Sequence, residues 1–105
     1  MNDSNTSISQ LKEAVHSLCV RKGWGENGVQ NPQHVAMAMS VEMAELLEHF
    51  QWGYDYDIDE VADELADVLN YCFLMAIELD LDVKEIILNK MEKNAIKYPP
   101  KRDIS

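Results

Sequence analysis

Residues 57–79 read DIDEVADELADVLNYCFLMAIEL and predict the central helix of the protein. Asp57 and the acids that follow it can cap the N-terminus of this helix. From Val68 to Ile77 the apolar side chains point in nearly every direction around the helix axis, and a helix that is apolar all round is buried all round. Four short helices in one small subunit can hardly bury it completely. We therefore expect a dimer or a larger assembly built on this helix.

Three further helices are expected on either side of this one. Ser7 opens a capping box, Asn31-Pro32 pairs an N-cap with a proline in the first turn, and Asp82 opens a second capping box. Tyr98-Pro99-Pro100 ends the last helix because proline disfavours a helical residue before it. The predicted helices cover about 8–22, 32–52, 58–79 and 83–97.

No segment reads as a strand, and the short loops favour an antiparallel packing of the helices. The sequence predicts an all-α, antiparallel four-helix bundle completed by homo-oligomerisation. We expect a single domain over residues 1–105, with flexible ends at 1–6 and 100–105.

Composition narrows the classes of partner. The chain has a formal net charge of -10 and a pI near 4.5, so it repels nucleic acid backbones and anionic membranes, and neither is expected as a partner. The N-terminal residues lack an apolar signal region, and the apolar run at 68–79 is too short to span a bilayer. Cys19 and Cys72 fall in apolar helical patterns and are expected to be buried free thiols. A cytoplasmic location fits these features.

Two acidic pairs carry the chemistry. Glu42-Met43-Ala44-Glu45 and Glu64-Leu65-Ala66-Asp67 each place two carboxylates one helical turn apart on one face. Both pairs border the core-facing stripes, so antiparallel packing of their helices can bring them face to face. Facing carboxylates repel one another and raise one another's pKa values.

A cation relieves that repulsion, and hard oxygen ligands select Mg²⁺ or Mn²⁺. A metal-bound triphosphate also lets an acidic protein bind an anionic substrate. Solvated surface pairs are the alternative for any isolated acidic pair, and it stays open at this point. A di-iron site is excluded because no glutamate is followed three positions later by histidine.

The chain resembles the all-α nucleoside triphosphate pyrophosphohydrolases, the MazG-like and dCTP-pyrophosphatase-like enzymes. The resemblance rests on E-x-x-E, 18 residues and E-x-x-D, within EMAELLEHFQWG (42–53), VADELADVLNYCFLMA (61–76) and KMEKNAIKYP (90–99). It implies hydrolysis between the α- and β-phosphates of a nucleoside triphosphate, giving a monophosphate and pyrophosphate. It also implies Mg²⁺ as the cofactor and a homo-oligomer, either dimer or tetramer. The catalytic metal ligands it implies are Glu42, Glu45, Glu64 and Asp67.

Further residues are expected to bind the substrate. The resemblance implies that Trp24 and Trp52 stack on the base and that His34 contacts it. Lys90, Asn94 and Lys97 share one helix face and can neutralise phosphates, and Tyr98 either contacts phosphate or caps the bundle. Asn70 and Tyr71 lie one turn beyond Asp67, and a buried Asn70 would need a polar partner.

The main hypothesis is a Mg²⁺-dependent pyrophosphohydrolase acting in nucleotide-pool house-cleaning. One alternative is a non-catalytic helical interaction module, but the presence of all four acids argues against it. The other is a pyrophosphohydrolase for a phosphoribosyl nucleotide, against which the two tryptophans argue weakly. The base and sugar preference and the number of metals remain open.

Overall fold

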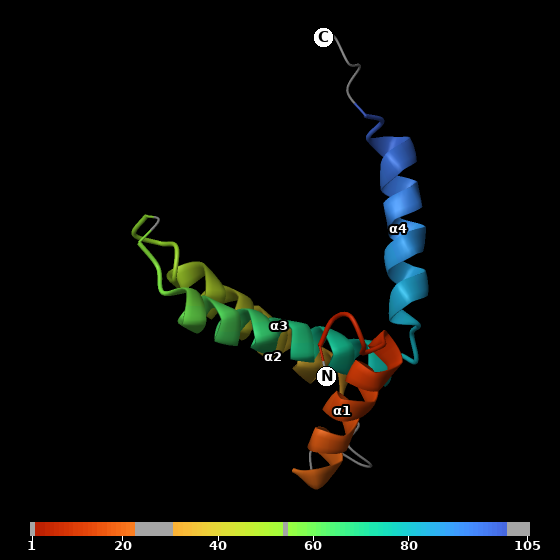
Figure 1. The fold of residues 1–105 in the computed structure, drawn as a ribbon, viewed down its shortest axis with the longest axis horizontal. Helices are drawn as coiled ribbons and strands as arrows, with labels where there is room; N and C mark the ends of the chain where they lie inside the picture. Colours follow the sequence, from red (N-terminus) through yellow and green to blue (C-terminus); the bar gives the residue numbers. More distant parts are fainter. Residues whose placement is uncertain (1, 23–30, 54, 101–105) are drawn as a thin grey trace.

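The computed structural model describes residues 2–22, 31–53 and 55–100. These residues form four helices and no strand: α1 (Ile8–Arg21), α2 (Pro32–Glu48), α3 (Ile58–Glu78) and α4 (Val83–Lys97) (Figure 1). The all-α prediction is confirmed. None of these helices combines the length and the apolar character needed to cross a bilayer.

Every helix begins at the capping residue that the sequence predicts. The Ser7 hydroxyl accepts from the Gln10 backbone N–H while the Gln10 side chain accepts from the Ser7 N–H, which completes a capping box. Asn31 caps α2 ahead of its proline, Asp57 accepts from two backbone N–H groups at the start of α3, and Asp82 accepts from the Glu85 N–H. These caps satisfy donors that have no partner within the helix.

The end of α2 differs from the prediction, which extended this helix to about Trp52. The α-helix ends at Glu48 because the backbone N–H groups of His49 and Phe50 donate to carbonyls three residues back instead of four. This tighter pattern is common in last turns. Gly53, at φ 116°, then turns the chain toward α3.

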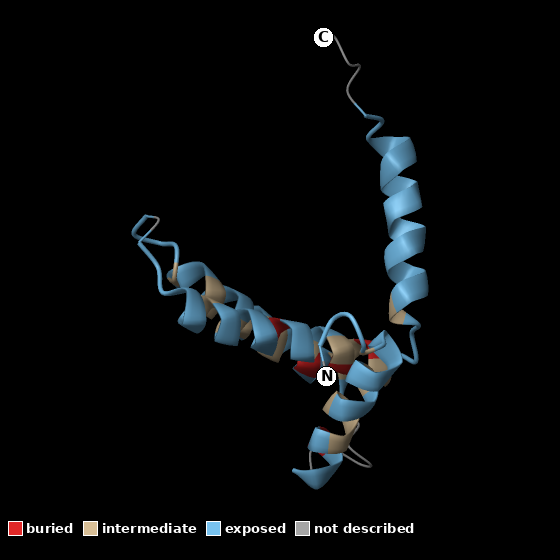
Figure 2. Ribbon diagram, viewed as in Figure 1, coloured by how far each residue is buried: buried red, intermediate tan, exposed pale blue. Residues whose placement is uncertain are grey.

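The helices α2 and α3 pack side by side as an antiparallel pair, and α1 crosses α3 near the C-terminal half of α3 (Figure 1). The core forms where these three helices meet (Figure 2). Cys19, Val35 and Leu74 are its buried centre, one from each helix, and Val15, Tyr71 and Met75 pack around them.

The second half of α3 is only partly buried in the single chain, as expected of a helix that one small subunit can hardly bury completely. Leu74 and Ala76 are buried, whereas Leu69 is 49% exposed and Cys72 is an exposed thiol. The physical reason is that α1 and α2 cover two sides of α3 and leave a third side open. The prediction of a buried Cys72 is therefore wrong for the single chain, and that of a buried Cys19 is confirmed.

Helix α4 leads away from the other three (Figure 1). The link into it contains Asp80 at φ 51°, and every residue from Lys84 to Lys97 is exposed. Its apolar side chains, including Ile87 and Met91, are exposed as well. Whether a second copy completes the four-helix arrangement stays a prediction.

Candidate active site

Antiparallel packing of α2 and α3 brings three of the predicted acids together. Glu42 comes from α2, and Glu64 and Asp67 come from one face of α3. One carboxylate oxygen from each lies within 4.8 Å of the other two. This spacing confirms that the two acidic motifs face one another.

The arrangement is unfavourable for the protein alone. Glu42 Oε2 and Glu64 Oε2 are both buried and have no hydrogen-bond partner. The pKa of Glu42 is raised to about 7, first by burial and then by the Glu45 charge and by the nearby carboxyl groups of Glu64 and Asp67. Because carboxylates only accept hydrogen bonds when ionised, Glu42 and Glu64 can bond to one another only by sharing a proton.

Glu45 occupies a neighbouring position. It is half-buried and near enough for its charge to raise the pKa of Glu42, yet it is not one of the three acids whose oxygens lie within 4.8 Å. The sequence treated the four acids as equivalent, and the geometry separates a central three from Glu45.

The central three acids fit a divalent cation. Buried carboxylate oxygens without a donor are costly, and a cation between them would satisfy both. Hard oxygen ligands of this kind suit Mg²⁺, Mn²⁺ or Ca²⁺ better than softer metals.

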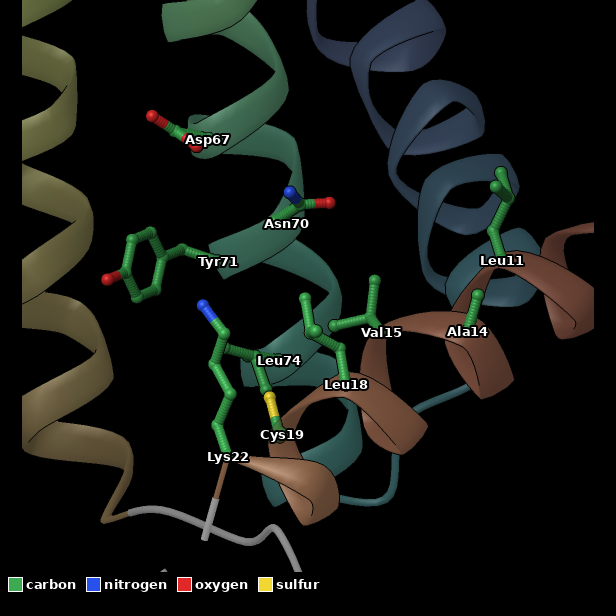
Figure 3. Close-up of a pocket in the computed structure, with 10 residues that line it drawn as sticks. All are labelled: Leu11, Ala14, Val15, Leu18, Cys19, Lys22, Asp67, Asn70, Tyr71 and Leu74. Atoms are coloured by element: carbon green, nitrogen blue, oxygen red, sulfur yellow. The ribbon is translucent and has the colours of Figure 1, made fainter. Parts of the chain in front are cut away.

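A pocket of about 360 Å³ opens beside these acids, between α1 and α3 (Figure 3). Its lining includes Asp67, Asn70 and Tyr71 from α3. Asn70 is exposed on the rim of this pocket, so the prediction of a buried Asn70 is wrong. Tyr71 is half-buried, and its pKa is raised by burial and then by the charges of Glu42 and Asp67.

The side of this pocket that α1 supplies was missed in the sequence. Leu11, Val15, Leu18 and Lys22 line it, and they recur every three to four residues along one face of that helix. This spacing was the sequence signal that could have located the α1 wall of the pocket. It shows that this face of α1 points inward, but it does not distinguish a face that packs in a core from a face that lines a pocket.

The remaining predicted substrate residues do not surround the acids in the described chain. Trp52 is 89% exposed beyond the end of α2, and His34 is exposed in the first turn of α2. Lys90, Asn94, Lys97 and Tyr98 are all exposed on or just after α4, which leads away from the acids (Figure 1). Trp24 lies outside the described residues. The binding roles of these residues stay predictions.

Comparison with known proteins identifies the family. The model of the MazG-like family matches residues 37–104, which include all four acids. The chain belongs to the MazG-like family. This MazG-like chain is similar to a pyrophosphatase of known crystal structure from Archaeoglobus fulgidus, with a TM-score of 0.77 and 30% identity over 95% of this chain and 99% of that one.

Curated relatives point the same way. The chain is 31% identical to dCTP pyrophosphatase 1 of Mus musculus and of Homo sapiens, in each case over 103 residues and 89% of this chain. The match spans 59% of the length of each of those two proteins.

Proposed function

We propose that this MazG-like protein is a Mg²⁺-dependent nucleoside triphosphate pyrophosphohydrolase. The observation that carries the proposal is the set of three carboxylates within 4.8 Å of one another, two of them with buried oxygens that lack a hydrogen-bond partner. A carboxylate cluster of this kind is unfavourable by itself and is suited to binding a cation. Relatives whose names include dCTP pyrophosphatase 1 support a deoxynucleoside triphosphate as the first substrate to test.

The reaction is hydrolysis of the phosphoanhydride link between the α- and β-phosphates. A water oxygen forms a bond to one of these two phosphorus atoms, and the bond from that phosphorus to the bridging oxygen breaks. The bridging oxygen keeps the electron pair and leaves with the other phosphate group, while the water proton passes to solvent or to a carboxylate. The products are a nucleoside monophosphate and pyrophosphate.

The residues of the chain hold and position the reactants. Glu42, Glu64 and Asp67 would hold the cation, and Glu45 lies close enough to act on its coordination through Glu42. When bound, Mg²⁺ supplies charge neutralisation on the phosphate oxygens, which is the main contribution to catalysis in phosphoryl transfer. It also offsets the repulsion between a chain of net charge -10 and an anionic substrate.

Product analysis in ¹⁸O-labelled water tests the proposal. Purified protein is incubated with Mg²⁺ and each deoxynucleoside triphosphate, and products are identified by phosphorus NMR and mass spectrometry. We expect pyrophosphate and a nucleoside monophosphate as the products, and the product that carries the ¹⁸O label identifies the phosphorus atom that water attacks. Sequential release of orthophosphate would contradict the proposal. A chelator and the Glu64→Gln variant are the controls for contaminating phosphatases.

A further inference from the structure

The link between α3 and α4 is held to the end of α3 by backbone hydrogen bonds. The Leu81 N–H donates to the Ala76 carbonyl oxygen at 2.8 Å, and the Asp80 N–H donates to the Ile77 carbonyl oxygen at 3.2 Å. These two bonds form a Schellman motif, in which Asp80, at φ 51°, takes the left-handed position that glycine usually occupies. The chain therefore leaves α3 through a turn of defined geometry.

The same link is tied to α1 by a lysine. The Lys12 Nζ donates to the Leu81 carbonyl oxygen at 2.8 Å, although the two residues are 69 positions apart in the sequence. Lys12 is half-buried, so its aliphatic stem lies against neighbouring groups while its charged end reaches the link. A cation is favoured at this place because the carbonyl end of α3 carries partial negative charge. Leu81 is thus bonded to α3 through its N–H and to α1 through its carbonyl oxygen.

The surroundings of Lys12 are open on two sides. One hollow of about 310 Å³ has Lys12 and Asp80 in its lining, and another of about 230 Å³ has Lys12 and Asp82. A side chain that lines both hollows lies between them. The space around the link is therefore loosely filled, and the bond from Lys12 restrains the link where packing does not.

Packing does not set the direction of α4 either. In the part of the chain that the structure describes, every residue from Lys84 to Lys97 is exposed (Figure 2). Asp82 caps α4 by accepting from the Glu85 N–H at 2.8 Å, so the helix begins directly after Leu81. A helix of 15 residues is about 22 Å long. A small rotation of the backbone at Leu81 therefore displaces the far end of α4 by a large distance.

We propose that Lys12 is a latch that fixes the direction of α4 relative to α1 and α3. With the bond to Leu81 in place, α4 extends as a rigid arm, and without this bond the arm swings about the link. The direction of α4 in turn decides where its exposed apolar residues, such as Ile87 and Met91, can meet another surface. The inference does not depend on the proposed reaction, because the latch involves neither the acids nor a substrate.

A distance measurement between spin labels tests the latch. The labels are attached at Asp63→Cys on α3 and Glu92→Cys on α4, both exposed positions, with the exposed Cys72 changed to serine and the buried Cys19 left in place. Labelled protein is diluted into an excess of unlabelled protein, so that double electron–electron resonance records distances within one chain. With Lys12 intact we expect a single narrow distribution of distances.

Variants of Lys12 separate its charge from its stem. Lys12→Met keeps most of the stem and removes the donor, so the distribution should become broad. Lys12→Arg keeps a cationic donor and should preserve the narrow distribution. Lys84→Met removes an exposed lysine from the first turn of α4 and is the matched control, for which no broadening is expected. Lys12→Ala is a second variant without a donor, to be used if Lys12→Met does not fold.

Hydrogen exchange gives a local measurement of the same bond. The Leu81 amide should exchange about tenfold faster in Lys12→Met than in the wild type, because a hydrogen bond to a charged group stabilises the link by an amount of this order. Lys84→Met should leave this rate unchanged.

Three outcomes of the distance measurement would overturn the latch. The first is an equally narrow distribution with and without the Lys12 donor, and the second is a broad distribution in the protein that retains Lys12. The third is equal broadening in Lys12→Met and Lys84→Met, which would show that positive charge in general, and not the bond to Leu81, sets the direction of α4.

Discussion

Glu42 makes the stability of the metal-free protein depend on pH. Its pKa is 4.5 as an ordinary glutamate and about 7 in the fold, so between these values the folded state binds more protons than the unfolded state. Stability therefore falls as pH rises through this interval. Below it the penalty is absent, and above it the penalty is complete.

We expect the melting temperature measured with a chelator to fall between about pH 5 and pH 8, and Glu42→Gln to reduce that fall. Glu92→Gln, an exposed position on α4, is the matched control. Scanning fluorimetry across the pH series provides the measurement. An identical pH dependence in Glu42→Gln and the wild type would show that ionisation of Glu42 does not change the stability of the fold.

The geometry also ranks the acids. Glu64→Gln removes one of the three converging carboxylates while keeping its shape, so activity should fall by orders of magnitude. Added Mg²⁺ should raise the melting temperature of the wild type and not of this variant. Glu45→Gln should lose less of both effects because Glu45 stands outside the central three. Equal losses in the two variants would place Glu45 among the direct ligands.

At the residue scale, the sequence predicted correctly that the two acidic pairs meet, but it predicted the exposure of individual side chains poorly. The three-residue spacing and the position beside the core stripes were enough to predict that the pairs meet. The predictions for Asn70 and Cys72 were wrong because an apolar stretch does not show which of its sides lacks a neighbour. Burial depends on the number of helices that pack against it.

Among the helices, α3 is stabilised at its N-terminus by the cap that Asp57 provides. Asp57 accepts from the backbone N–H groups of Asp59 and Glu60 at distances of 2.9 and 3.4 Å. Asp57→Ala should cost about 1 kcal/mol of stability and lower the melting temperature by about 4–8 °C. Asp55→Ala, two residues before the cap, should change it little. Calorimetry that found equal melting temperatures for the two variants would show that Asp57 adds nothing to the cap.

Helix starts were predictable because a capping side chain leaves a local signature. Ser7, Asn31, Asp57 and Asp82 all cap the helices expected of them. The end of α2 was not predictable, because no helix-breaking residue occurs before Gly53. The change to a tighter turn is made by backbone hydrogen bonds and leaves no mark in the sequence. The course of α4 depends on a link of a few residues near Asp80, for which the sequence offered no geometric signal.

At the scale of the whole molecule, the described residues form a small apolar core and leave many apolar side chains exposed. Among the described residues, five apolar side chains are buried, and exposed ones occur on every helix. Large exposed apolar areas mark interaction surfaces. The exposed residues Ile58, Leu65 and Leu69 follow one another at seven- and four-residue spacings along one face of α3, which is the pattern of a helix that packs on another helix.

We expect a homo-oligomer, at least a dimer at micromolar concentration, by light scattering. Its melting temperature should rise with protein concentration, because association stabilises the folded state by mass action. Leu69→Glu should lower the oligomer mass, and Asp63→Lys, an exposed polar position on α3, should not. A folded wild-type monomer of 12.0 kDa would contradict this expectation.

The pocket wall and the acids lie largely on different helices, and this bears on how the chain can diverge. Helix α1 supplies one wall of the pocket beside the acids and none of the acids, which come from α2 and α3. Substitutions in α1 can therefore accumulate without changing the acid cluster, whereas Asp67 belongs to both the cluster and the pocket. In this architecture the shape of the pocket can change through α1 while the α2–α3 pair that carries the acids stays the same.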